Sequence, residues 1–75
     1  YYWAWYNRAL ALKQLGKLTQ VVASYNKAIE FKPDFEEAWT NRGNALYHLG
    51  QLESAIASYD RALELRPDNP NTLYN

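Results

Sequence analysis

The sequence contains no cysteine among its 75 residues and no evident cluster of metal-ligating side chains. Neither disulfides nor a structural zinc ion can therefore supplement its core. A chain of this length buries only about 60% of the surface that its unfolded form exposes. We therefore expect its stability to come from helix packing or from contact with neighbouring protein.

An excess of either charge is also missing, because eight Lys and Arg residues balance eight Asp and Glu residues. A binder of nucleic acid or of an anionic membrane normally needs a basic surface, so both functions are disfavoured. No apolar run approaches the roughly 20 residues of a membrane span, and the first residues lack the pattern of a signal peptide. The sequence predicts a soluble, cytoplasmic protein. It begins without methionine and stops within a repeated pattern, so we expect a fragment of a longer protein.

Groups that could carry out catalysis are few. His48 is the only histidine, and there is no cysteine nucleophile. The three serines, Ser24, Ser54 and Ser58, lie in helical patterns outside any Gly-x-Ser-x-Gly elbow, so we expect them on solvated helix surface. No phosphate-binding loop or metal-ligand spacing is present. We predict that the chain is not an enzyme and holds no cofactor or metal.

A repeat of 34 residues organises the whole chain. Shifted by this period, the sequence matches itself at 17 positions without a gap. The matching pairs include Ala4 and Ala38, Trp5 and Trp39, Asn7 and Asn41, Arg8 and Arg42, Ala11 and Ala45, Leu12 and Leu46, Leu15 and Leu49, Gly16 and Gly50, and Tyr25 and Tyr59. A fixed period of this length indicates stacked supersecondary units.

Apolar residues recur at intervals of three and four within each unit, which predicts amphipathic helices. Four helices are expected near residues 3–15, 18–31, 35–49 and 52–65, and a fifth is expected to begin at Pro70.

Glycine and proline mark the ends of these helices. Gly16 and Gly50 each follow the last apolar residue of a first helix, where we expect a left-handed cap. Pro33 and Pro67 end the second helices. Asp34 then lies where its carboxylate would cap the third helix.

The spacing resembles the tetratricopeptide signature W-x2-L-G-x2-Y, then A-x3-F, then P. The second unit supplies Trp39, Gly43, Leu46, Ala55, Tyr59 and Pro67, and the first supplies Trp5, Ala9, Leu12, Val21, Tyr25 and Pro33. Arg8 and Arg42 replace a leucine of the motif, and we expect their apolar stems to cover the surface there. The resemblance implies an all-α fold, a right-handed superhelix of stacked antiparallel hairpins. Repeats are expected at 2–35 and 36–69, with the start of a third at 70–75.

Small and aromatic residues alternate in a way that suits close helix packing. Ala9 and Gly43 on the first helices leave room for a neighbouring backbone, and Tyr25 and Tyr59 on the second helices fill the space beside them. We expect Gly43 to mark a close approach of two helices.

The resemblance implies a protein–protein interaction scaffold that binds a peptide or a partner helix in the concave groove lined by first helices. Its predicted binding residues are Trp3, Tyr6, Asn7, Leu10, Lys13, Gln14, Glu37, Thr40, Asn41, Asn44, Tyr47, His48 and Asn75. Two alternatives stay open. The units could stack or self-associate without a groove ligand, or they could form the regulatory domain of a larger enzyme.

Asparagine recurs on the expected inner face, at Asn7, Asn41 and Asn75. The row is similar to the asparagine ladder of O-linked N-acetylglucosamine transferases, which implies contacts with the backbone of an extended peptide. The alternative is that each amide pairs within the fold or with water.

The resemblance also suggests a comparison with the carboxylate clamp of chaperone-binding tetratricopeptide domains. Asn41 matches one clamp asparagine. Tyr6 stands in place of a clamp lysine, Leu10 in place of an asparagine, and Asn71 in place of a cation. The match is therefore incomplete and disfavours this particular use.

Both ends of the chain carry more apolar side chains than the motif requires. Tyr1, Tyr2, Trp3 and Tyr6 could form an aromatic contact patch or could pack against a preceding repeat. The last helix is expected to expose Ile56, Tyr59, Leu63 and Leu65, so we expect self-association through the repeat ends.

Overall fold

The computed structural model describes residues 1–66, which form four helices and no strand. The helices are α1 (Tyr2–Gln14), α2 (Leu18–Phe31), α3 (Glu36–His48) and α4 (Leu52–Leu65). Each begins and ends within one residue of its expected range, closer than helix ends are usually assigned. The all-α fold of packed helical hairpins is confirmed. The fifth helix expected from Pro70 lies outside the described residues.

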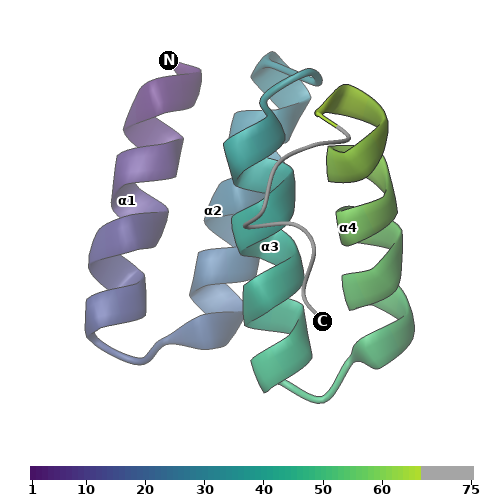
Figure 1. Cartoon of the computed structure of the whole chain (residues 1–75). Coiled ribbons are helices and arrows are strands. Elements are labelled where there is room, and N and C mark those ends of the chain that lie inside the picture. The colour runs from purple at the N-terminus through teal and green to yellow at the C-terminus, as the bar shows by residue number, and fades with distance from the viewer. Residues whose placement is uncertain (67–75) are drawn as a thin grey trace.

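Each helix packs on the next one in the chain, so α2 and α3 are the inner pair (Figure 1). α1 and α4 lie at opposite ends of the row (Figure 1). Each end helix therefore has a neighbour on one side only among the described residues. The outer faces of α1 and α4 are therefore not covered by another described helix, whereas α2 and α3 bury their facing sides against each other.

The turn within each hairpin depends on glycine, as expected. Gly16 has a φ of 74° and Gly50 a φ of 82°, a left-handed conformation that side chains with a Cβ disfavour. In the residue that follows each glycine, the backbone amide donates to a helix carbonyl: Lys17 to the Leu12 carbonyl at 3.1 Å, and Gln51 to the Leu46 carbonyl at 2.9 Å. These bonds satisfy carbonyls at the helix ends, and the chain reverses within the three residues between the helices of each hairpin.

The expected cap at Asp34 is wrong. The residue at the N-cap of α3 is Phe35, and no side chain there accepts a capping hydrogen bond. Asp34 instead forms an exposed ion pair with Lys32 at 3.5 Å. The Trp39 indole holds the turn in another way, since its Nε1 donates to the Pro33 carbonyl at 2.8 Å.

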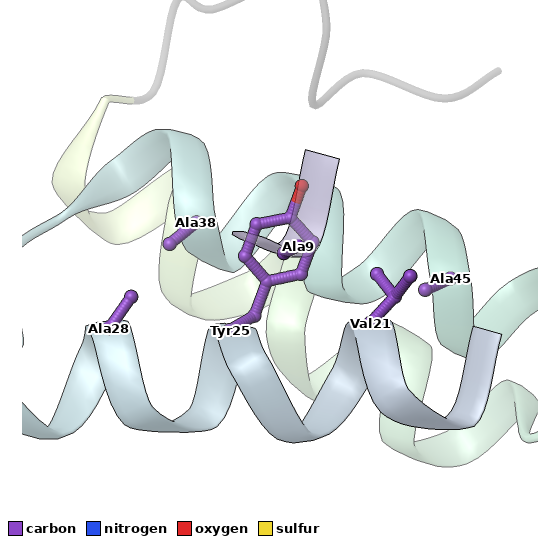
Figure 2. Packing of buried hydrophobic residues seen from close by; sticks show 6 residues of the cluster. All are labelled: Ala9, Val21, Tyr25, Ala28, Ala38 and Ala45. Carbon is purple, nitrogen blue, oxygen red and sulfur yellow. The ribbon is translucent and has the colours of Figure 1, made fainter. Parts of the chain in front are cut away.

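The core lies around α2. Tyr25 and Ala28 on α2 are fully buried, together with Ala9 on α1 and Ala38 on α3. Figure 2 shows Val21, Tyr25 and Ala28 projecting from α2 toward alanines of the other two helices. Because alanine side chains are short, the helices approach closely and the large tyrosine ring fills the space between them.

The close approach expected at Gly43 is confirmed. A Cβ built on this glycine would lie 2.8 Å from Cε1 of Tyr59, closer than two carbon atoms can pack. Tyr59 is consequently only 3% exposed, so its expected exposure at the end of the chain is wrong. Ile56 on the same helix is 47% exposed and does lie at the surface.

Two serines expected on solvated surface are in fact buried. Ser24 and Ser58 have no exposed area, and each accepts a hydrogen bond from an arginine one helix earlier. Arg8 donates from Nη1 to Ser24 Oγ at 2.6 Å, and Arg42 makes the equivalent bond to Ser58. A buried hydroxyl needs such a partner, because leaving it unpaired is costly. Ser54 is exposed, as expected.

Arg42 also joins the two hairpins. Its Nε donates to the Asn26 side-chain carbonyl on α2 at 2.6 Å, while its Nη1 reaches Ser58 on α4. The guanidinium carbon lies 5.8 Å from the centre of the Trp39 ring, within range of a cation–π contact. Burial lowers the pKa of Arg42. Arg42 therefore joins α2, α3 and α4. The sequence had predicted only that its apolar stem covers the helix surface.

Replacing Gly43 with leucine should destabilise the chain by about 1–3 kcal/mol, because the added side chain collides with the Tyr59 ring. A smaller substitution, Gly43→Ala, adds only the Cβ that would lie 2.8 Å from Cε1 of Tyr59, so it should also destabilise the chain, but by less than the leucine variant. Urea unfolding measures both, and equal stability of the leucine variant and the parent would contradict this packing.

Candidate functional site

The residues expected to bind a peptide lie on α1 and α3, but they differ in how open they are. Those with exposed side chains are Trp3, Asn7, Leu10, Lys13, Gln14, Glu37, Tyr47 and His48. Tyr6, Asn41 and Asn44 are half-buried, Thr40 is buried, and Asn75 lies outside the described residues. We call the surface formed by these α1 and α3 side chains the α1–α3 face.

Thr40 does not contribute to an open surface. Its hydroxyl donates to Oε2 of Glu36 at 2.8 Å, and the two residues are 3% and 4% exposed. The other Glu36 oxygen lies 3.9 Å from a nitrogen of Arg66, which follows α4. Thr40 and Glu36 therefore hold α3 to the end of α4, so Thr40 is a structural residue of this face. The sequence placed it at the surface because the motif position alone does not reveal the carboxylate one turn earlier.

Asn7 and Asn41 share a repeat position but not an environment. Asn7 is exposed, whereas the Asn41 amide nitrogen donates to the Tyr6 hydroxyl at 3.2 Å. The difference arises because Asn41 reaches back 35 residues to a side chain of the first unit, a partner that Asn7, itself in the first unit, lacks among residues 1–66. The two described members of the asparagine row therefore offer different groups to a ligand, with Asn7 fully available and Asn41 partly used within the fold.

Tyr6 connects this face to the core. Its ring centre lies 4.8 Å from that of Phe35 and 5.8 Å from that of Tyr25. Burial raises the pKa of Tyr6, and the nearby Glu37 carboxylate raises it further. The phenols of Tyr6 and Tyr25 therefore remain neutral at physiological pH, so Tyr6 acts as a hydrogen-bonding group and carries no charge.

A pocket of about 100 Å³ opens between the C-terminal halves of α1 and α3. It is lined by Lys13, Leu18, Val21, Asn41, Asn44, Ala45 and His48. The four polar residues of this lining were all predicted from the sequence. Leu18 and Val21 form part of the apolar wall and were missed, because they lie on the second helix, whose apolar positions are read as packing.

Asn44 is oriented within this pocket by the core. Its side-chain carbonyl oxygen accepts a hydrogen bond from the Tyr59 hydroxyl. Because the oxygen is held by Tyr59, the amide nitrogen is left to donate to a ligand. The ammonium group of Lys13 adds up to three further donors, and His48 adds one or two. The pocket thus presents donors and positive charge, which suits a carboxylate.

The aromatic residues at the start of α1 form two groups. Tyr1 and Trp3 stack with their centres 5.3 Å apart and their planes 15° apart, and both are exposed. Tyr2 meets Phe35 edge-on at 5.3 Å and lies 5.2 Å from the Lys32 ammonium. The patch therefore consists of Tyr1, Tyr2 and Trp3, with Tyr6 turned toward the core.

Within residues 1–66, no three His, Asp or Glu side chains lie close enough to hold a metal ion. None of the four described helices combines the length and the apolar content that crossing a membrane requires.

Comparison with known proteins shows which families share this pattern. A family profile described as "Tetratricopeptide repeat" matches residues 36–69, and one described as "TPR repeat" matches residues 11–50. Among solved structures, the chain is similar to the first TPR domain of Spaghetti (RPAP3) bound to the HSP90 peptide SRMEEVD, with 32% identity and a TM-score of 0.93. The similarity covers 97% of this chain and 58% of that one. No curated protein matches the sequence.

Because Tyr25 is buried, we expect the free energy of unfolding of the chain to fall at high pH. Burial raises the pKa of Tyr25 to about 12, with Tyr6 adding to the rise and Asn41 opposing it. An unfolded tyrosine releases its proton near pH 10. Between about pH 10 and pH 12 the folded chain holds a proton that the unfolded chain has lost, so the free energy of unfolding should fall by up to about 1.4 kcal/mol per pH unit.

Urea unfolding at a series of pH values from about 8 to about 12 measures the effect. Tyr25→Phe keeps the ring and removes the ionising hydroxyl, so its stability should fall less steeply than that of the parent. The same slope in both proteins would show that Tyr25 is not held neutral by its burial.

Proposed function

Since the chain belongs to the tetratricopeptide repeat family, a family of protein-interaction repeats, we propose that it binds an extended acidic peptide along the α1–α3 face. The observation that carries this proposal is the pocket between α1, α2 and α3, where Lys13, Asn44 and His48 converge. Side chains from two different repeats meet there, so the site exists only when both hairpins are stacked.

The pocket chemistry favours a carboxylate over other peptide groups. Lys13 supplies a positive charge, and Asn44 supplies an amide donor whose orientation is fixed by Tyr59. Charge-assisted hydrogen bonds of this kind are about twice as strong as neutral ones. A neutral or basic side chain would leave these donors unpaired, which is unfavourable.

The charge along the α1–α3 face also sets a direction for the peptide. Glu37 lies at the end of α3 near Tyr6, whereas Lys13 and His48 lie at the opposite ends of α1 and α3. An acidic peptide residue is repelled at the first end and attracted at the second. We therefore place the acidic residue of the peptide over the pocket and its apolar residues toward Leu10 and Trp3.

The similar structure supports the same ligand class. Its peptide, SRMEEVD, carries three acidic side chains in its last four residues. This chain spans 58% of the length of that one, and we propose that it binds a ligand of the same class. Leu10 and Tyr6 stand in place of family groups that clamp a terminal carboxylate, so in our proposal Lys13, Asn44 and His48 supply the recognition instead.

The peptide backbone requires polar partners as well. Asn7 is exposed on α1, N-terminal to Lys13 on the same helix, and its amide offers both a donor and an acceptor. Asn41 shares its amide with Tyr6, so its contribution is smaller. We propose that Asn7 and Asn44, and not an equal row of asparagines, hold the backbone.

We propose that the repeats span residues 2–35 and 36–69, with a third unit starting at 70. We also place the interaction in the cytoplasm and assign the chain no catalytic step. A binding module needs only a preformed surface, which the packing of Tyr25 and Tyr59 provides.

Calorimetric titration with the peptide SRMEEVD tests this proposal. Replacing Lys13 with glutamine should weaken binding by about 1 kcal/mol, roughly a fivefold change, because one charge-assisted bond is lost. The matched control is Lys27→Gln on α2, which removes the same charge from an exposed ion pair with Glu30, away from the pocket. Binding to the control should equal that of the parent.

A second peptide, in which both glutamates and the aspartate are replaced by their amides, checks the ligand class. It should bind the parent and the Lys13→Gln variant equally weakly. If Lys13→Gln and Lys27→Gln change the affinity for SRMEEVD to the same extent, the pocket is not the binding site.

A further inference from the structure

The pocket between α1 and α3 contains the only histidine of the chain. His48 is the last residue of α3, and it lines this pocket together with Lys13 from α1 and Asn44, which lies one turn earlier on α3. Its side chain is exposed, so protons from solvent can reach the imidazole. Histidine is the residue type that ordinarily changes its charge between about pH 5 and pH 8. One side chain can therefore make the charge of the pocket depend on pH.

The elements around His48 bring one further charged group to the pocket. On α1 this group is Lys13, and α2 contributes Leu18 and Val21, which cannot ionise. No described residue of α4 lines the pocket. On α3 itself, the Tyr47 ring meets the His48 ring edge-on, with their centres 5.7 Å apart. Among residues 1–66, no Asp or Glu lines the pocket, so its charged groups are all basic.

The acidic residues of α3 lie far from this pocket along the helix. Glu36 and Glu37 are in the first turn of α3, and His48 is in the last. The helix has 13 residues. At about 1.5 Å per residue, its two ends lie roughly 18 Å apart, which exceeds the distance of about 8–10 Å over which salt screens exposed charges. A negative charge close to His48 must therefore come from a ligand.

A carboxylate in the pocket and a proton on His48 favour each other. A negative charge a few ångströms away stabilises the protonated form of an imidazole. In return, an imidazolium holds a carboxylate more strongly than a neutral imidazole does, because charge-assisted hydrogen bonds are about twice as strong as neutral ones. The two effects are reciprocal: if binding draws in a proton, then a higher proton concentration strengthens binding by the same factor.

We propose that His48 takes up a proton when an acidic residue of the peptide enters the pocket, so that the chain binds acidic peptides more tightly as the pH falls from about 8 to about 6. The proton comes from the buffer and stays on the imidazole until the peptide leaves. His48 has this role only if the proposed function holds, since a peptide carboxylate must enter the pocket. Lys13 then supplies a constant positive charge, and His48 supplies one that pH controls.

Few other groups in the complex change their charge in this pH range. The chain has one histidine and no cysteine. Carboxylates ordinarily release their protons near pH 4, and tyrosine and lysine near pH 10 or above. The exceptions are the α-amino groups, which titrate near pH 8. Acetylation removes that of the peptide, and that of the chain is on Tyr1, at the opposite end of α1 from Lys13.

Calorimetric titration with N-acetylated SRMEEVD at about pH 8 and about pH 6 tests the proposal. The parent should bind about fivefold more tightly at the lower pH, because a neutral hydrogen bond becomes charge-assisted. His48→Gln keeps a hydrogen-bond donor but cannot take up a proton, so its affinity should be the same at both pH values. Lys27→Gln, on α2 outside the pocket, should show the same rise as the parent.

The proton itself can be counted by repeating the titration at about pH 7 in two buffers that differ in their ionisation enthalpy. The parent should take up a fraction of one proton for each peptide bound, and His48→Gln should take up none. A purely structural role of His48 would change the affinity without this proton uptake. Circular dichroism and urea unfolding of the parent at both pH values check that the fold itself does not change.

Two outcomes would overturn this role of His48 and leave the proposed peptide site in place. The first is an affinity of the parent that is equal at both pH values but still weakens in Lys13→Gln. The second is a pH dependence that persists in His48→Gln, because another group would then take up the proton. If SRMEEVD does not bind at either pH, both this role and the proposed function are wrong.

Discussion

The packing of Tyr25 among alanines of three helices is the interaction on which the rest of the structure depends. Its ring lies in a cluster with Ala9 of α1 and Ala38 of α3, and all three residues are fully buried. A smaller residue would leave a cavity, and larger partners would force the helices apart. Because α1 and α3 are held at this spacing, Tyr6 and Asn41 meet above Tyr25. The proposed peptide-binding face is therefore a consequence of the core.

The repeat explains why similar residues acquire different roles. Arg8 and Arg42 both hold a buried serine, but only Arg42 has a second helix beside it, and it uses its Nε to bind that helix through Asn26. Arginine at this repeat position therefore links two hairpins in the second unit. In the first unit it binds only within its own hairpin among residues 1–66. Stability in such arrays is a sum over units and their interfaces, and within residues 1–66 the interface between the two hairpins is the contact of α2 with α3.

Much of the fold followed from the sequence, because helix periodicity and glycine position are local signals. The left-handed turn at Gly16 and the close contact at Gly43 needed no knowledge of distant residues beyond the repeat. The errors have two causes: a polar side chain finds its partner on another element, or a helix begins one residue later than its expected cap. Ser24 is buried because Arg8 reaches it from α1, and Asp34 does not cap α3 because the chain enters the helix one residue later, at Phe35.

The candidate site divides in the same way. The polar pocket residues Lys13 and His48 could be predicted from their positions on first helices, since those positions face one side of the row. Two other features could not be predicted, the burial of Thr40 against Glu36 and the pairing of Asn41 with Tyr6. Each depends on a position at which the two units carry different residues. Repeat symmetry predicts where a side chain points, and the exceptions to that symmetry decide what it binds.

The most direct measurement of the central claim, that the core prepares the α1–α3 face for an acidic peptide, is an NMR titration that follows side-chain amide resonances. We predict that SRMEEVD shifts the side-chain amide of Asn44 and the ring signals of His48, and leaves Asn26 unchanged, since Asn26 on α2 is engaged by Arg42 on α3. Shifts at Asn26 with none at Asn44 would contradict the claim.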